Sequence, residues 1–174
     1  MPGILQADNP YLHGMFQSER YFDSTADLLR LHFSFRYPPQ PAVAELPQEI
    51  QSGPSIALHF RLGDYQRNPE FARSIGSLDF EYYHRALTML RQRSPNAKVY
   101  LFSDEIETVA ESFQLSGPHE YVRVVRPFHA YDKIRLMAAC DHIAVANRTF
   151  SWWAAWLNQN PEKLVIAPDP WFVN

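Results

Sequence analysis

The chain has 174 residues, a formal net charge of −3 and an apolar content of 46%, which together fit one soluble domain with a full hydrophobic core. The small negative charge excludes the broad basic surface of a nucleic-acid-binding protein, so any anion site must be built locally from a few cations. No run reaches the roughly 18 apolar residues of a membrane span, and the first residues lack the pattern of a signal peptide, so we expect a cytoplasmic protein, with peripheral attachment to the inner membrane left open.

The first fifty residues differ in pattern from the rest. An amphipathic segment over 23–35 predicts a helix that starts at Asp23 or Ser24. The proline-rich stretch from Pro38 to Pro47 predicts a linker or a surface crossing. We therefore divide the chain into a helical segment with its linker, residues 1–50, and a domain over residues 51–174.

From residue 55 onward, apolar runs alternate with segments of helical periodicity. Five runs predict strands: SIALHF, KVYLFSD, YVRVV, HIAVAN and KLVIAP. Apolar residues at helical spacing predict helices over 80–90, 106–113 and 134–138, and a fourth helix opens at Phe150. This alternation predicts an α/β fold, a Rossmann-like parallel sheet with flanking helices, whose ligands bind beyond the carboxyl ends of the strands.

The most informative segment, residues 142–158, leads from an apolar strand directly into a helix. A helix N-terminus that is free offers unpaired backbone N–H groups and a partial positive charge, which suit a diphosphate. The hydroxyls of Thr149 and Ser151 can either cap this helix or contact the anion. Because the helix is apolar on both faces, we expect both to be buried, with Trp152, Trp153 and Trp156 as core residues rather than a platform for sugar stacking.

A second polar motif, HFRLGDY over 59–65, follows the first predicted strand. His59 and Arg61 share one side of an extended backbone, and the planar guanidinium of Arg61 can grip a diphosphate in a bidentate manner. A simple Arg61–Asp64 pair that holds the loop is the alternative. Neither GxGxxG after the first strand nor GxxxxGK[ST] occurs, which argues against an ordinary nicotinamide or P-loop site.

Three other polar features favour structural roles. Ser103 and Asp104 after the second strand are most simply the N-cap of the helix at Ile106. Cys140, the only cysteine, lies in an apolar helical run and is expected to be a small core residue. The seven histidines lack the spacing of zinc ligands, so no metal site is predicted.

The combination of HFRLGDY, LFSDE, LMAACDHIAVANRTFSWWAAWLN and LVIAPDPWF resembles the C-terminal half of the bacterial α1,2-fucosyltransferase family, and GMFQSERYF is similar to the segment that joins its two halves. The resemblance implies the C-terminal lobe of a GT-B type glycosyltransferase, with residues 1–50 between the lobes and residues 51–174 as the GDP-fucose-binding lobe. Family members carry a preceding glycine-rich lobe and usually continue past the final WF, so we expect the chain to be incomplete at both ends.

The family's activity implies a metal-independent, inverting transfer of L-fucose from GDP-β-L-fucose to a galactoside 2-hydroxyl, with no cofactor besides the donor. His59 and Arg61 match its HxR signature, in which the arginine holds the β-phosphate and stabilises the departing GDP. Asp64 and Glu70 are the candidates for the general base that activates the acceptor hydroxyl, and the sequence does not separate them.

The remaining donor-binding residues implied by the resemblance lie at the start of the tryptophan-rich helix. This segment, which receives the diphosphate or the base, comprises Asn147, Arg148, Thr149, Phe150 and Ser151.

Three positions depart from the family's pattern. Leu62 stands where a second arginine is common, and Arg148 replaces a serine, where it adds a phosphate contact or faces solvent. Lys133 stands where related enzymes place an acid that recognises guanine. Either the neighbouring Asp132 replaces that acid after a small register change, or backbone groups read the guanine.

Three hypotheses of function result. The first is an active fucosyltransferase whose partners are GDP-fucose and a galactose-containing glycan. The second is a non-catalytic GDP-sugar-binding lobe that lacks the acceptor half, and a lobe of this kind is expected to self-associate through its exposed inter-lobe face. The third, a regulatory α/β domain of receiver type, leaves Arg61 and the FSWW helix unexplained.

Overall fold

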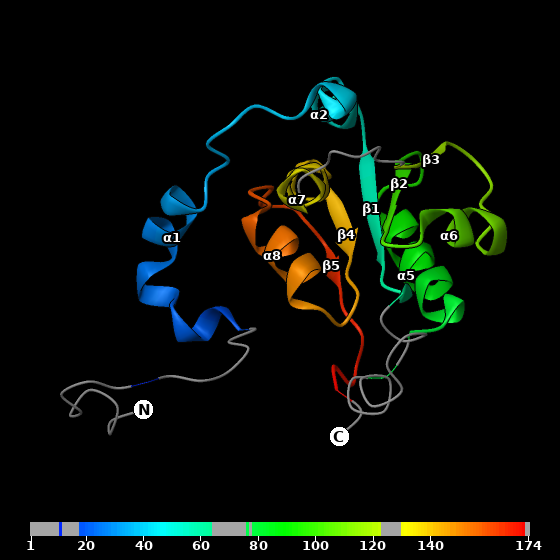
Figure 1. Cartoon of the computed structure of the whole chain (residues 1–174). Coiled ribbons are helices and arrows are strands. Elements are labelled where there is room, and N and C mark those ends of the chain that lie inside the picture. The colour runs from blue at the N-terminus through cyan, green and yellow to red at the C-terminus, as the bar shows by residue number, and fades with distance from the viewer. Residues whose placement is uncertain (1–10, 12–17, 64–75, 77, 123–129, 173–174) are drawn as a thin grey trace.

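The computed structural model describes residues 11, 18–63, 76, 78–122 and 130–172 (Figure 1). Its centre is a five-stranded sheet in the order β3-β2-β1-β4-β5, and all four neighbouring pairs are parallel. The strands are β1 (Ser55–Phe60), β2 (Lys98–Ser103), β3 (His119–Tyr121), β4 (His142–Ala144) and β5 (Val165–Ile166). The predicted α/β fold with a parallel sheet is therefore confirmed.

Helices cover both faces of this sheet. They are α1 (Ala26–His32), α2 (Leu46–Gln51), α5 (Phe80–Arg93), α6 (Ile106–Ser112), α7 (Ala130–Ala139) and α8 (Thr149–Leu157), with 3-10 turns at Glu19–Tyr21, Asp23–Thr25 and Pro41–Val43. Figure 1 shows α5 and α6 on one face of the sheet and α7 and α8 on the other. The chain thus forms a three-layer α/β/α arrangement around the sheet.

The alternation of β1 divides the core into two clusters. Ile56, Leu58 and Phe60 point into the cluster with α5 and α6, whereas Ala57 belongs to the cluster with α7 and α8. Because side chains alternate along a strand, His59 shares the face of Ala57 and lies on the α7 and α8 side. A one-residue change of register would move it to the other face.

The side chains that begin α5 tie it to the sheet. Asp79 caps the helix by accepting a hydrogen bond from the Tyr82 backbone N–H at 2.9 Å. The Tyr82 hydroxyl reaches the carbonyl oxygens of Val145 at 2.7 Å and Ile166 at 3.1 Å, and the Tyr83 hydroxyl donates to the His59 carbonyl at 3.0 Å. These bonds hold the ends of β1, β4 and β5 in place beside the site described below.

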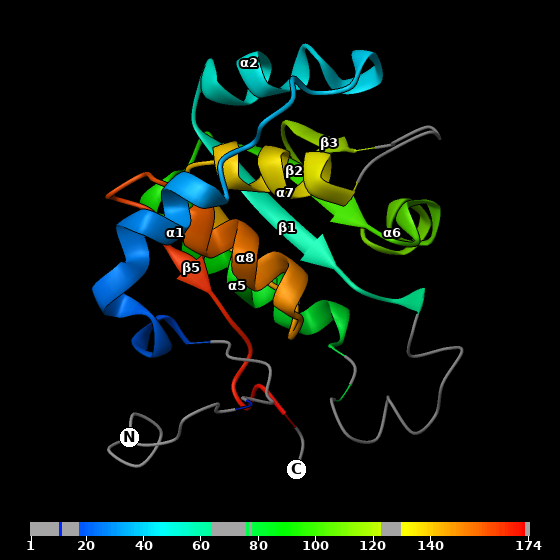
Figure 2. The ribbon, with the colours of Figure 1, turned by 60° about the vertical axis from the view of Figure 1, so that its left-hand side comes forward.

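The N-terminal segment covers the outer side of α8, where α1 lies beside it (Figure 2). The ring of Phe22 stacks on Trp153 with centroids 6.1 Å apart and meets Trp156 edge-on at 5.3 Å. Arg30 lies 4.6 Å above the Trp156 ring. Helix α8 is packed on both sides as predicted, but of its tryptophans only Trp156, at 6% exposure, is buried. Trp152 and Trp153 are partly buried, so the prediction of core positions is wrong for these two. All three belong to an aromatic cluster formed by the chain itself.

The proline-rich stretch contributes more than the predicted surface crossing. It contains the helical turn Pro41–Val43 and the start of α2, and Val43 and Ile50 are each only 1% exposed within the core. Cys140 is buried as predicted, and its thiol contacts the Leu136 carbonyl. Among the described residues, no helix is long and apolar enough to cross a membrane.

Candidate functional site

A pocket of about 320 Å³ lies at the carboxyl end of β1. The strand order reverses between β1 and β4, and in parallel sheets ligands bind at such a switch point, beyond the carboxyl ends of the strands. Four elements supply the lining: the ends of β1 and β2 and the first turns of α7 and α8. The lining residues are His59, Arg61, Ser103, Asp104, Ala130, Lys133 and Phe150.

His59 forms the floor of this pocket as a neutral imidazole. It is 4% exposed, and burial, assisted by the positive charge of Lys133, lowers its pKa to about 3. Its Nδ1 atom is buried and has no hydrogen-bond partner among the described residues. Its ring lies 5.5 Å from that of Phe150. His59 therefore offers a hydrogen-bonding nitrogen, but no charge, at neutral pH.

Two cations line the pocket against one carboxylate. Nη1 of Arg61 lies 3.4 Å from Oδ2 of Asp104, and Nζ of Lys133 donates to the Ser103 carbonyl at 2.6 Å. Partial burial lowers the pKa of Lys133, against the opposing effect of Asp104. With His59 neutral, the charged groups of the lining sum to a net positive charge, which suits an anion.

Two helix N-termini reach the same pocket. Ala130 is the first residue of α7, and Phe150 is the second residue of α8. The backbone N–H groups of a first helical turn have no partner within the helix and carry the positive end of its dipole. In α8, the hydrogen bond from the Trp152 N–H to the Arg148 carbonyl, at 3.2 Å, lies C-terminal to these N–H groups. The pocket therefore combines side-chain cations with helix ends that favour negative charge.

The other residues predicted in the strand-to-helix turn hold its shape. Ser151 is fully buried, and its hydroxyl donates to the carbonyls of Ala146 at 3.1 Å and Arg148 at 3.4 Å. The Asn147 side-chain amide donates to the Gly76 carbonyl at 3.2 Å. Arg148 is the N-cap residue of α8 and Thr149 its first residue, and of the predicted set in this turn only Phe150 lines the pocket.

On α7, the structure places Lys133 in the pocket rather than Asp132. Asp132 is completely buried, and its Oδ1 lies 3.6 Å from Nη1 of Arg135. From the sequence, Lys133 was predicted only as a departure from the family pattern. No local signal separates it from Asp132, because its position in the pocket depends on how α7 packs on the sheet.

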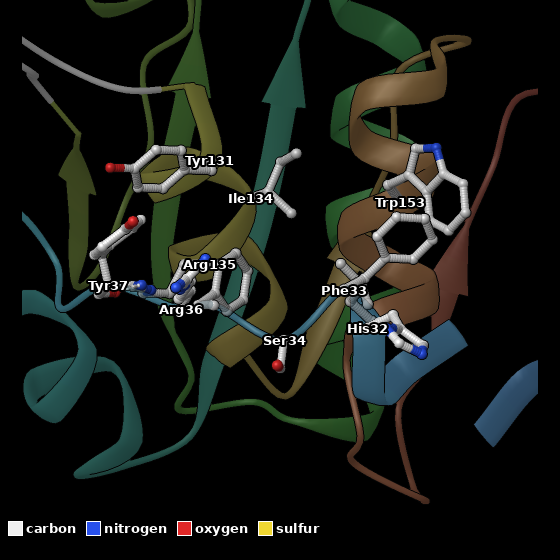
Figure 3. A pocket seen from close by; sticks show the side chains of 11 residues that line it. His32, Phe33, Ser34, Arg36, Tyr37, Tyr131, Ile134, Arg135 and Trp153 are labelled. Carbon is white, nitrogen blue, oxygen red and sulfur yellow. Dashed lines mark hydrogen bonds between the residues drawn. The ribbon is translucent and has the colours of Figure 1, made fainter. Parts of the chain in front are cut away.

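A larger pocket of about 520 Å³ lies on the outer side of α7 and α8, where residues 32–37 cross these helices. Figure 3 shows Tyr131, Ile134 and Arg135 of α7 and Trp153 of α8 around it. Arg135 donates to the Tyr37 carbonyl and stacks over the Phe35 ring at 4.8 Å. Of the two arginines that line this pocket, Arg135 thus fastens the N-terminal segment, and Arg36 lies over the Tyr37 ring at 5.7 Å.

The predicted capping role of Asp104 is wrong. The N-cap residue of α6 is Glu105, with no side-chain capping bond, and the Ser103 hydroxyl accepts from the Glu105 N–H at 3.0 Å. Asp104 instead accepts hydrogen bonds from the backbone N–H groups of Leu62 and Gly63, both at 3.0 Å. Desolvation alone would raise its pKa, but the Leu62 hydrogen bond, the Arg61 charge and the Gly63 hydrogen bond outweigh it and hold the pKa below its usual range.

The predicted general bases, Asp64 and Glu70, lie outside the described residues. The alternative Arg61–Asp64 pair includes Asp64 and therefore lies partly outside them too. Arg61 pairs with Asp104. No cluster of three or more His, Cys, Asp or Glu side chains in the described ranges is placed to hold a metal ion.

Comparison with known proteins places this chain in a family. The model described as "Glycosyl transferase family 11" matches residues 3–171. An Escherichia coli protein named O-antigen biosynthesis glycosyltransferase WbnK is 30% identical over 179 residues, covering 97% of this chain and 57% of that protein. An Escherichia coli alpha-1,2-colitosyltransferase is 31% identical over 160 residues, covering 91% of this chain and 55% of that protein. The chain therefore spans little more than half the length of these relatives. The solved structure of POFUT1 in complex with GDP-fucose aligns with a TM-score of 0.47 and 14% identity, over 71% of this chain and 46% of that one.

Proposed function

Because the chain belongs to glycosyl transferase family 11, we propose that its pocket binds the diphosphate of a nucleotide-sugar donor. The observation that carries this proposal is the meeting of Arg61, Lys133 and the N-termini of α7 and α8 around one cavity. Each of these groups favours an anion, and ligands of parallel sheets bind at this edge, beyond the carboxyl ends of the strands.

We further propose that the donor is GDP-β-L-fucose and that the complete enzyme transfers L-fucose with inversion to the 2-hydroxyl of a galactoside. The HxR motif formed by His59 and Arg61 and the helix start at Thr149 and Phe150 support this assignment through their resemblance to the α1,2-fucosyltransferases. A relative named for an alpha-1,2 transfer supports the linkage. A cytoplasmic location and self-association through an exposed face remain part of this proposal.

In this mechanism the pocket stabilises the leaving group. Negative charge accumulates on the diphosphate as the bond to the sugar breaks, and preorganised cations and N–H groups lower the energy of that state most. The Arg61 fork grips two phosphate oxygens. Lys133 supplies a second positive charge. Leu62, which stands where the family usually has a second arginine, supplies none. We propose that these groups perform the charge neutralisation that other glycosyltransferases obtain from a metal ion.

The remaining steps belong to groups around the pocket. His59, neutral and buried, donates or accepts one hydrogen bond without adding charge. An inverting displacement needs a base that removes the proton of the acceptor hydroxyl as the oxygen attacks the sugar carbon opposite the departing diphosphate. Asp64 and Glu70 stay the two proposed bases.

A non-catalytic nucleotide-sugar-binding lobe is the second candidate. It is favoured by the lining of the pocket, which comes from one sheet and its helices, whereas catalysis between two lobes needs both. Release of GDP in the presence of GDP-fucose and a galactoside by the chain alone would exclude this candidate. Donor binding without such turnover would support it.

Calorimetric titration of the chain with GDP, GDP-fucose and ADP in the presence of EDTA tests the proposal. We expect saturable, guanine-selective binding that weakens at least tenfold, about 1.4 kcal/mol, in both Arg61→Ala and Lys133→Ala. Arg85→Ala, which removes an exposed arginine on α5, is the matched control and should bind like the unmodified chain. Equal affinity in the two pocket variants and the control would refute the assignment of the pocket.

A further inference from the structure

We propose that Asp104 is a positioning residue that fixes the loop after β1 and sets Arg61 in the orientation in which it meets the donor diphosphate. This inference rests on the proposed function of the pocket. It explains why a carboxylate, which by its charge repels an anion, lies at the edge of a pocket proposed to bind one.

The Asp104 carboxylate binds three successive residues of another strand's loop. Oδ1 accepts from the Leu62 N–H and Oδ2 accepts from the Gly63 N–H, each at 3.0 Å, while Oδ2 lies 3.4 Å from Nη1 of Arg61. We call this set of contacts the Asp104 clasp. Both oxygens of one side chain thereby fix the backbone on the far side of Arg61 as well as its guanidinium.

Gly63 is required by the clasp for space. A Cβ atom at this position would lie 2.8 Å from Oδ2 of Asp104 and 2.9 Å from Oε1 of Glu105, closer than real Cβ atoms come. The positive-φ glycines of the described chain are Gly76 and Gly117, so the backbone conformation at residue 63 does not demand glycine. The glycine of the HFRLGDY motif therefore permits the close approach of the carboxylate.

The clasp restrains the Arg61 side chain through one end of its guanidinium fork. A guanidinium carries five N–H donors in a fixed plane, and Nη1 is the atom that lies 3.4 Å from Oδ2 of Asp104. The Arg61 side chain is 35% exposed, and a long side chain at such a position loses rotamer freedom when it binds a ligand. Holding it in one orientation reduces the entropy lost when the diphosphate binds, which strengthens binding without a direct contact between Asp104 and the ligand.

Two possible roles of Asp104 predict opposite changes in the affinity for GDP. If its charge simply repels the ligand, Asp104→Asn should bind GDP more tightly than the unmodified chain. If it positions Arg61, Asp104→Ala should weaken GDP binding at least tenfold, and Asp104→Asn by a smaller factor because the amide oxygen keeps one acceptor. Glu111→Gln removes an equal charge from an exposed site on α6 and should change nothing.

Two further variants separate positioning from general damage to the fold. Gly63→Ala should reproduce the loss seen in Asp104→Ala, because its methyl group displaces the same carboxylate. In an Arg61→Ala background, Asp104→Asn should alter the GDP dissociation constant by less than twofold, since the residue it positions is gone. A loss of equal size in both backgrounds would mean a structural role only and would overturn the inference.

Hydrogen exchange in the ligand-free chain tests the clasp independently of the donor. The amide protons of Leu62 and Gly63 should exchange slowly in the unmodified chain and at least tenfold faster in Asp104→Ala, which removes both acceptors. Unchanged exchange in Asp104→Ala, or unchanged or tighter GDP binding in Asp104→Asn, overturns the inference. Slow exchange without any GDP binding by the unmodified chain refutes the proposed function and, with it, the role of the clasp, while confirming the clasp's geometry.

Discussion

Lowering the pH from 8 to 5 should destabilise the fold by about 2 kcal/mol through His59 alone. The pKa of this residue falls from its ordinary value of 6.5 to about 3 on folding, because the imidazole is buried beside the positive charge of Lys133. The unfolded chain therefore binds more protons than the folded chain between these two values. The contribution of neutral His59 to the free energy of unfolding is fully present above pH 6.5 and is lost progressively as the pH falls toward 3.

The magnitude follows from the ratio of protonated to neutral histidine in the unfolded chain. At pH 5 this ratio is about 30, which corresponds to ~2 kcal/mol, and at pH 3 the accumulated cost reaches ~4 kcal/mol. Other groups also titrate in this range, so the measured quantity must be the difference between two chains. His59→Phe removes the titration and keeps a ring of similar size against Phe150.

Guanidinium denaturation of both chains at pH 8 and pH 5 measures this difference. We expect the unmodified chain to lose about 2 kcal/mol more than His59→Phe between the two pH values. His84→Phe, a change at an exposed histidine on α5, should behave like the unmodified chain. An equal acid sensitivity in the His59 variant, or an imidazole that titrates near 6.5 in the folded chain, would refute the reasoning.

Two further predictions concern packing around the site. Tyr82→Phe removes the hydroxyl that contacts the carbonyls of Val145 and Ile166, and should lower the free energy of unfolding by about 1–2 kcal/mol in denaturant titrations. A change below about 0.5 kcal/mol, the range of ordinary surface substitutions, would show that water replaces the bond. Phe22→Ala opens the aromatic cluster over α8 and should cost about 2 kcal/mol while shifting tryptophan emission to longer wavelength. Phe172→Ala, at a ring that is 43% exposed, is its control, and an unchanged emission spectrum in Phe22→Ala would contradict the observed packing.

Local patterns in the sequence predicted the sheet and its helices, with the exception of α2, which starts in the stretch predicted as a linker. Runs such as SIALHF and KVYLFSD predicted strands buried on both faces, and β1 and β2 are buried along almost their whole length. The period of two also placed His59 and Arg61 on one side of the strand, and the structure finds both in one pocket. These features depend on residues that are close in sequence, and for that reason they were predictable.

The tertiary structure alone decided which polar groups meet. Asp104 was predicted to cap its own helix because capping rules consider only neighbouring residues, whereas its partners Leu62 and Gly63 are 42 and 41 residues away in the sequence. Lys133 and Asp132 are adjacent in sequence but about 100° apart around a helix. The rotation of α7 is set by the burial of Leu136 and Met137 against the sheet, and this packing turns Lys133 into the pocket and Asp132 toward Arg135. Side-chain contacts between distant segments follow from the packing of whole elements, which no local pattern records.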